Sequence, residues 1–161
     1  MMQNITIICE GKLKEKYLRD ACAEYSKRLS AYCKLNIIEL NPHRISDNPS
    51  AAEIESALES EAKEILSKIQ SNAKVYAMCI EGKQMPSERL ASELSGCGVN
   101  GFNNVVFIIG GSHGLSEKVK KRADIRLSMS EMTFPHQLAR VMLLEQVYRA
   151  YQISNGGKYH K

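Results

Sequence analysis

The chain has 161 residues, of which 43% are hydrophobic and 25% are charged. This length is typical of one domain, and it can bury a core without disulfides or a structural metal, so we expect a single domain over 1–161. The composition argues against a disordered chain. Lys and Arg number 22 against 18 Asp and Glu, and this mild basic surplus permits a nucleic-acid partner without requiring one.

The cysteines carry neither a disulfide pattern nor a metal pattern. There are five of them, an odd number, and no two have C-x-x-C spacing. This usage predicts reduced, mostly buried thiols in a cytoplasmic protein that holds no metal. The first residues lack a charged segment followed by a long apolar run, so we expect no secretory signal. The longest apolar run, 105–109, is far too short to span a bilayer, and we expect no membrane contact.

Strand and helix patterns alternate along the first half of the chain. A β-branched, apolar strand is expected at 5–9, and apolar residues at helical spacing follow it between Tyr17 and Leu29. A second strand is expected at 35–40. Two Asn-Pro pairs make 41–49 a loop. Ser50 and Glu53 have the spacing of a capping box, which predicts that a helix begins there and continues through Ile69.

The second half continues the alternation. A third strand is expected at 75–80, ended by 81–83, and then a short helix that Ser87 caps and that ends at Leu94, before a glycine-rich turn at 96–101. The run 105–109 is apolar on both faces, which is typical of a central parallel strand. A short basic helix at 116–123 and a strand at 125–128 follow. Pro135 suits the first turn of a last helix at 136–151, whose broad apolar face predicts burial on more than one side.

This alternation predicts an α/β fold with a mainly parallel sheet, helices on both faces and right-handed crossovers. Ligands of such folds bind at the carboxyl ends of the strands. The loops that follow the strands are therefore the candidates for chemistry.

The loop Gly110-Gly111-Ser112-His113-Gly114 follows the most apolar strand. Its glycines let the backbone approach a ligand, or they simply make a tight turn. It matches neither the dinucleotide fingerprint nor a phosphate loop. It does match G-x-S-x-G, and Asp124 and His136 follow in the order of a Ser–Asp–His triad. A small α/β serine hydrolase is therefore an alternative hypothesis, weakened by the short chain and by the place of His136 at a helix start.

Two further loops are candidates. The segment 127–136 contains Met129, Met132 and Phe134, which are either core residues or the walls of a site for an adenosine and a sulfonium. The segment 78–83 lies at the end of the third strand, and a parallel sheet brings such ends together. Basic residues gather at 12–19, at 118–122 and at the C-terminus. Each run alone is typical of a solvated face, whereas their convergence on one surface would indicate nucleic-acid binding.

Taken together, these motifs are specific. The glycine loop with its preceding strand, the segment Thr133-Phe134-Pro135-His136 and the ending Tyr159-His160-Lys161 resemble the RlmH family of ribosomal RNA large-subunit methyltransferases, small members of the SPOUT class. The same likeness extends over 11–15, 140–141 and 145–150, and it is weakest at 41–50.

The resemblance implies a fold, a ligand and a substrate. The fold would carry a C-terminal trefoil knot, an exception to the rule that chains are not knotted. The protein would be a homodimer that methylates N3 of a pseudouridine in the helix 69 loop of 23S rRNA, in the assembled ribosome. The cofactor would be S-adenosylmethionine, and the residues carried over to bind it are Met78, Gly110, Met129, Ser130, Glu131, Met132, Thr133 and Phe134.

The chemistry also needs a way to remove the N3 proton or to stabilise the resulting anion. Histidine is suited to proton transfer near neutrality, which makes His160 a candidate base. Arg140 or Arg149 would stabilise the anion or grip phosphate, and Tyr159 would stack on a base or donate a hydrogen bond. We hypothesise that the tail closes over the target base, in its own or the partner's active site. For the tail, the alternative is a disordered chain end. For the base, it is deprotonation by water beside an arginine, and for the function as a whole it is a non-enzymatic RNA-binding domain.

Overall fold

The computed structural model describes residues 2–161. Its five strands form one sheet in which every neighbouring pair is parallel, in the order β2-β1-β4-β3-β5. The strands are β1 (Gln3–Glu10), β2 (Cys33–Leu40), β3 (Lys74–Lys83), β4 (Asn104–Ile109) and β5 (Ile125–Leu127). The helices are α1 (Lys16–Leu29), α2 (Ala51–Ser67), α3 (Ser87–Val99), α4 (Glu117–Arg122) and α5 (His136–Ser154).

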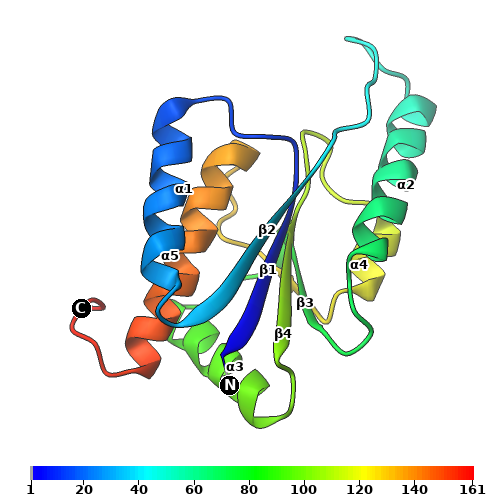
Figure 1. The fold of residues 1–161 in the computed structure, drawn as a ribbon. Helices are drawn as coiled ribbons and strands as arrows, with labels where there is room; N and C mark the ends of the chain where they lie inside the picture. The colour runs from blue at the N-terminus through cyan, green and yellow to red at the C-terminus, as the bar shows by residue number, and fades with distance from the viewer. Residues whose placement is uncertain (1) are drawn as a thin grey trace.

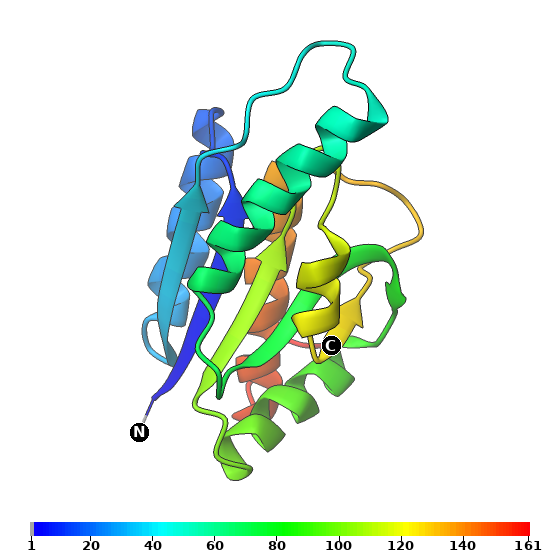
Figure 2. The same ribbon diagram turned by 90° about the vertical axis from the view of Figure 1, so that its right-hand side faces the viewer.

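Helices cover both faces of the sheet, as predicted. Figure 1 shows α1, α3 and α5 on one side and α2 and α4 on the other, and Figure 2 shows α2 and α4 lying across the sheet. Alternate residues of the strands therefore enter two cores. Phe107 of β4 stacks on Tyr76 of β3 under the first group of helices, with ring centroids 4.8 Å apart. Ile108 packs with Ile65 and Val119 under the second group.

β4 is the middle strand, which confirms the prediction from its two apolar faces. It pairs with β1 on one side and β3 on the other, and Val105, Phe107 and Ile108 are fully buried. The last helix is also buried on more than one side, as expected. α5 packs against both α1 and α3, and its residues Leu143 and Leu144 are buried.

Several local predictions were wrong. α3 does not end at Leu94 but runs through Gly96 and Gly98, because Cys97 is buried in the first core and its burial outweighs the low helix propensity of glycine. The N-cap position of α3 is occupied by Pro86, and Ser87 donates instead to Oε1 of Gln146 at 2.6 Å.

The end of β3 and the start of α5 also differ from the prediction. β3 continues through the expected stop at 81–83 because Lys83 pairs with Leu127 of β5. Pro135 lies at the N-cap of α5, one residue before the first turn. By contrast, the capping box at Ser50 is confirmed, since its Oγ accepts from the backbone N–H of Glu53 at 3.1 Å.

The trefoil knot stays a prediction. Within residues 2–161, no helix is long and apolar enough to cross a membrane.

Candidate functional site

The glycine loop has a shape that requires glycine. A Cβ at Gly110 would press on the carbonyl group of Gly114, 2.6 Å from its carbon. Gly114 itself has a φ of +78°, in the left-handed region that side chains disfavour. Its N–H donates to the carbonyl of Gly111 at 3.0 Å, which closes the turn. The loop therefore folds back tightly on the end of β4 and brings bare backbone to the carboxyl edge of the sheet.

β3 contributes a bulge at the same edge. Met78 and Lys83 both pair with Leu127, so the residues between them loop out of the ladder. This bulge carries Cys79, Ile80 and Glu81 to the wall of a cavity. Nζ of Lys120 lies 2.5 Å from Oε1 of Glu81, and this contact lowers the pKa of the Glu81 carboxyl.

The loop between β5 and α5 forms the opposite wall. Ser128 donates from Oγ to the carbonyl of Ser130 at 3.0 Å, and Ser130 Oγ accepts from the N–H of Met132 at 3.0 Å. These local bonds give the irregular segment a defined path without regular secondary structure.

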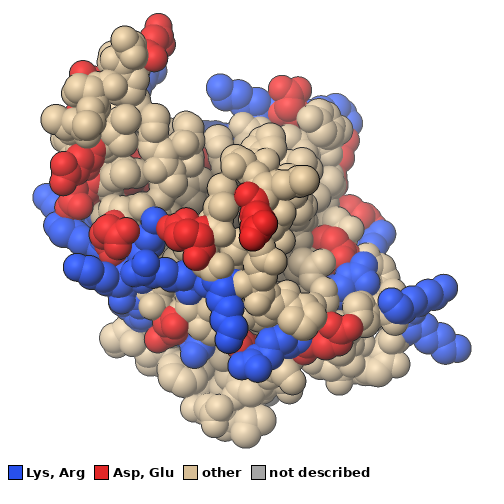
Figure 3. All heavy atoms as spheres, turned by 180° about the vertical axis from the view of Figure 1, so that it is seen from behind, with Lys and Arg blue, Asp and Glu red and all other residues tan. Residues whose placement is uncertain are grey.

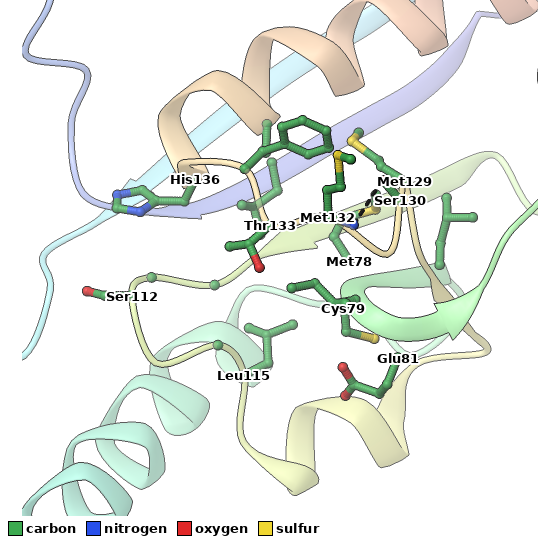
Figure 4. A pocket seen from close by; sticks show the side chains of 18 of the residues that line it. Met78, Cys79, Glu81, Ser112, Leu115, Met129, Ser130, Met132, Thr133 and His136 are labelled. Carbon is green, nitrogen blue, oxygen red and sulfur yellow. Dashed lines mark hydrogen bonds between the residues drawn. The ribbon is translucent and has the colours of Figure 1, made fainter.

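Figure 4 shows the cavity that these three segments enclose. Thr133 and Met132 lie across it from Cys79, while Ser112 and His136 lie toward one end. All of the predicted cofactor residues line it except Glu131, whose side chain is exposed. The structure therefore gathers Met78, Gly110, Met129, Ser130, Met132, Thr133 and Phe134 around one space.

Some lining residues were not named as cofactor residues. Leu127 and Cys79 lie within the candidate segments 127–136 and 78–83, whereas Leu115 and Lys120 lie outside the candidate loops. Leu115 directly follows the glycine loop, and its apolar character next to that loop was the available signal. The Cys79 position depends on the β3 bulge, for which the local sequence gives no periodic signal.

The predicted catalytic arginine, Arg140, lies elsewhere. It is buried, with 3% of its side chain exposed, and its Nη1 is 2.6 Å from Oε2 of Glu39. Nη2 donates to the carbonyl of Gly11 at 3.0 Å. In this structure Arg140 therefore holds the end of β2 and the turn after β1, and it does not line the cavity of Figure 4.

The predicted tail residues pack on their own chain. Tyr159 donates to Oε2 of Glu145 at 2.6 Å, and its ring meets the guanidinium of Arg149 at 4.7 Å. Its hydrogen bond to Glu145 raises the pKa of the Tyr159 hydroxyl. His160 lies 2.6 Å from Oε1 of Glu88 through Nε2. The tail thus packs against α5 and the start of α3, outside the cavity of Figure 4.

The hydrolase triad is not assembled. Asp124 accepts from the N–H of Val75 at 2.8 Å, and Val75 stands at the beginning of β3. Ser112 follows the carboxyl end of the parallel strand β4, so serine and aspartate lie at opposite ends of the sheet. The G-x-S-x-G match is therefore a feature of the glycine turn and not a nucleophile elbow.

The basic runs do not merge into one patch on the face seen in Figure 3. Lys and Arg gather over α4 and β5 with acidic side chains among them. Lys118 pairs with Glu59, and Lys120 pairs with Glu81. By contrast, Lys12 and Lys14 are exposed at a second cavity and form no ion pair within residues 2–161.

Comparison with known proteins identifies the class of the chain. A family model described as "Predicted SPOUT methyltransferase" matches residues 2–160, so the chain belongs to the SPOUT methyltransferase family. A SpoU methyltransferase, AviRb from Streptomyces viridochromogenes, solved in complex with AdoMet, is 11% identical with a TM-score of 0.49, covering 98% of this chain and 60% of that one.

Much closer relatives define the family within that class. Proteins named "Ribosomal RNA large subunit methyltransferase H" are 56% identical in Clostridium perfringens (strain 13 / Type A), 55% in Clostridium botulinum (strain Eklund 17B / Type B) and 53% in Clostridioides difficile (strain 630). Each match extends over 158 residues and covers 98% of this chain and 99% of the relative. The chain belongs to the family of ribosomal RNA large subunit methyltransferase H, the RlmH family.

Proposed function

We propose that this protein transfers the methyl group of S-adenosylmethionine to N3 of a pseudouridine in the helix 69 loop of 23S rRNA, within the assembled ribosome. Membership of its family makes it an rRNA methyltransferase with S-adenosylmethionine as methyl donor. The observation that carries the proposal is the convergence of Met78, the glycine loop and the 129–134 segment on one cavity.

The residues present fit this cofactor. Leu115, Leu127 and Phe134 give apolar surface for an adenine ring. The missing Cβ at Gly110 leaves the backbone open to the ligand. The thioethers of Met78 and Met129 are soft, polarizable neighbours for a sulfonium. Bound there, S-adenosylmethionine supplies an electrophilic methyl group.

The protein's own contribution is mainly to position the reactants. Methyl transfer is an in-line displacement, and alignment of donor and acceptor supplies much of the rate enhancement. The glycine turn and the 128–132 hydrogen bonds hold two walls of the cavity in place. Glu131, exposed beside the cavity, would contact the cofactor from its rim.

The tail supplies the remaining proposed residues. Tyr159 and His160 would close over the target base in the partner subunit of a homodimer, with Tyr159 stacking on the base and His160 holding it by a hydrogen bond. To do so the tail would exchange its present contacts, which are Tyr159 with Glu145 and His160 with Glu88 and Arg149. Arg140 would act in this reaction by positioning, through Gly11. A ribosomal substrate places the protein in the cytoplasm.

A direct test is methylation of purified ribosomes. The protein is incubated with methyl-labelled S-adenosylmethionine and ribosomes from a strain that lacks the modification, and the 23S rRNA is analysed by mass spectrometry. N3-methylpseudouridine in the helix 69 fragment is the expected product. An unlabelled fragment, from protein that binds the cofactor in calorimetry, would contradict the proposed substrate. Absence of cofactor binding would instead favour a non-enzymatic RNA-binding domain.

A further inference from the structure

A second cavity, of about 580 Å³, adjoins the cofactor cavity of about 250 Å³. The two share Gly111, Ser112 and His136 in their walls. The second cavity lies between the glycine loop, the start of α5, the N-terminal half of α2 and the 41–50 loop. That loop arches above the sheet in Figures 1 and 2.

Glu10 is the unexpected residue in this cavity. It is the last residue of β1, only 3% exposed, and neither of its carboxylate oxygens has a hydrogen-bond partner within residues 2–161. Burying a carboxylate without a hydrogen-bond donor costs folding free energy. Such unpaired groups in native proteins often bind a ligand or take part in catalysis. Its Cβ would lie 3.6 Å from a Cβ built on Gly111, so the carboxylate stands directly beside the loop that separates the two cavities.

The rest of the second cavity suits a nucleotide. Ile45, Ile54 and Leu58 give an apolar wall against which a base can lie. Lys12 and Lys14 lie exposed at its rim and form no ion pair among the described residues. Their ammonium groups are therefore available to contact a phosphate.

We propose that the second cavity receives the methyl-accepting base and that the Glu10 carboxylate accepts the proton of its imide N–H. This inference rests on the proposed function. The N–H bond breaks and its proton goes to Glu10, the nitrogen lone pair forms the new N–CH₃ bond, and the C–S bond of S-adenosylmethionine breaks with its electrons left on sulfur. The neutral Glu10 then releases its proton to water.

The surroundings of Glu10 suit a proton acceptor that works near neutrality. Burial, together with the nearby carboxylates Glu61 and Glu64, raises the pKa of Glu10 to about 7. A general base is most effective when its pKa lies close to the working pH. The charged and titratable groups that face it are Glu61 and Glu64 of α2, His43 of the 41–50 loop, His113 of the glycine loop, His136 of α5, and Lys12 and Lys14 of the turn after β1.

The test compares Glu10→Gln with Glu55→Gln, a control on an exposed part of α2 outside both cavities. Single-turnover methylation of ribosomes is measured from about pH 5.5 to 8.5, together with the affinity for S-adenosylmethionine. Glu10→Gln is expected to lower the rate by about 100-fold or more, the usual scale of a lost general base, with cofactor affinity unchanged. The wild-type and control rates should rise with pH and level off once Glu10 is ionised, whereas the Glu10→Gln rate should rise without this plateau, because only the imide itself is left to titrate.

A second readout does not depend on turnover. In protein labelled with ¹³C at glutamate carboxyls, the Glu10 signal is assigned by its loss in Glu10→Gln. Millimolar pseudouridine 5′-monophosphate, in the presence of S-adenosylhomocysteine, is expected to shift that signal and its titration midpoint. An unmoved Glu10 signal would overturn the base-binding role of the cavity.

The outcomes separate this inference from the proposed function. Wild-type protein that fails to methylate ribosomes would refute the function, whatever Glu10 does. Active wild type together with equally active Glu10→Gln would refute only the role of Glu10. If Glu10→Gln does not fold, Glu10→Asp keeps a carboxylate but withdraws it from the cavity. That variant should react more slowly while it retains the pH dependence, and an unchanged rate would count against the proposal.

Discussion

Arg140 of α5 and Glu39 of β2 form an ion pair, 2.6 Å from Nη1 to Oε2, in which the arginine side chain is 3% exposed and the glutamate 34%. The same guanidinium donates to the carbonyl of Gly11 at 3.0 Å. Arg140 thus ties the start of the last helix to β2 and to the turn beside Glu10. This position makes it a structural anchor of the carboxyl edge of the sheet.

Replacing Arg140 with Met should therefore destabilise the fold. The variant keeps most of the apolar volume but leaves Glu39 without its cation and Gly11 without its donor. Loss of one partner of a buried pair costs about 3–5 kcal/mol, and partial hydration of Glu39 should reduce this to about 2–4 kcal/mol. Urea unfolding measures the difference.

The matched control is Lys16→Met, which removes a cation from the exposed Lys16–Asp20 pair. It should leave the unfolding midpoint unchanged, because exposed pairs contribute little. If Arg140→Met and Lys16→Met unfold at the same urea concentration, the anchoring role of Arg140 is wrong.

The case of Arg140 shows what sequence patterns can and cannot predict. The apolar run 105–109 and the alternation around it were enough to predict β4 in the centre of a parallel sheet, because burial on both faces leaves a continuous apolar signal. The capping box at Ser50 was equally local. Arg140 belongs to a motif that resembles a catalytic family. Its partners Glu39 and Gly11, however, are more than a hundred residues away along the chain. Pairings at that distance leave no periodic trace.

The residues of the cofactor cavity also differ in how far the sequence could predict them. Gly110 and the 129–134 segment were found from motifs that resemble a family, whereas periodicity alone left them as core or turn. Cys79 lay in the candidate segment 78–83, but its place in the cavity wall could not be predicted because it depends on the register shift of β3 against β5. Glu10 was missed because it ends an apolar strand and belongs to no motif, and its significance appears only when its burial and missing partners are known.

Gly110→Ala should abolish cofactor binding. The added methyl group would press on the Gly114 carbonyl, so the loop must shift away from its cavity-forming path. Titration calorimetry with S-adenosylmethionine should show no binding heat. Gly98→Ala is the control, since within the described residues nothing lies within 4 Å of a Cβ there. Gly98 lies in the last turn of α3, so Gly98→Ala should change the stability little and leave the affinity unchanged. Equal affinities in the two variants would contradict the role of the loop.

S-adenosylmethionine should protect Cys79 from alkylation. Cys79 is partly exposed and lines the cofactor cavity, whereas Cys9, Cys22, Cys33 and Cys97 are buried. Burial raises the pKa of the Cys79 thiol, so labelling with iodoacetamide is best followed at alkaline pH. Peptide mass spectrometry should show Cys79 modified first and slowed at least severalfold by saturating cofactor. Equal labelling rates with and without cofactor would place the cofactor elsewhere.

Deletion of Tyr159–Lys161 should separate catalysis from cofactor binding. These residues contact α5 and α3 but not the cofactor cavity, so the affinity for S-adenosylmethionine should not change. Methylation of ribosomes should fall by about 100-fold or more if the tail positions the base. The single substitution Tyr159→Phe, which loses the hydrogen bond to Glu145 but keeps the ring, should retain most activity if stacking is its role. Full activity of the deletion would refute the tail's function.

Glu10 should make the stability of the protein depend on pH in an unusual direction. Its pKa is raised from 4.5 to about 7 in the folded state, so between these values the folded chain binds more protons than the unfolded chain. The contribution of Glu10 to the unfolding free energy should therefore be largest below about pH 4.5, and it should be lost as the pH rises through about 7.

In Glu10→Gln this contribution is absent. Relative to wild type, the variant should gain about 2.5 kcal/mol between pH 5 and pH 8, most of the energy of a shift of this size. Urea unfolding at the two pH values measures the gain, with Glu55→Gln expected to show none. A difference between wild type and Glu10→Gln that is the same at both pH values would mean that Glu10 is ionised in the fold, and that a donor satisfies it.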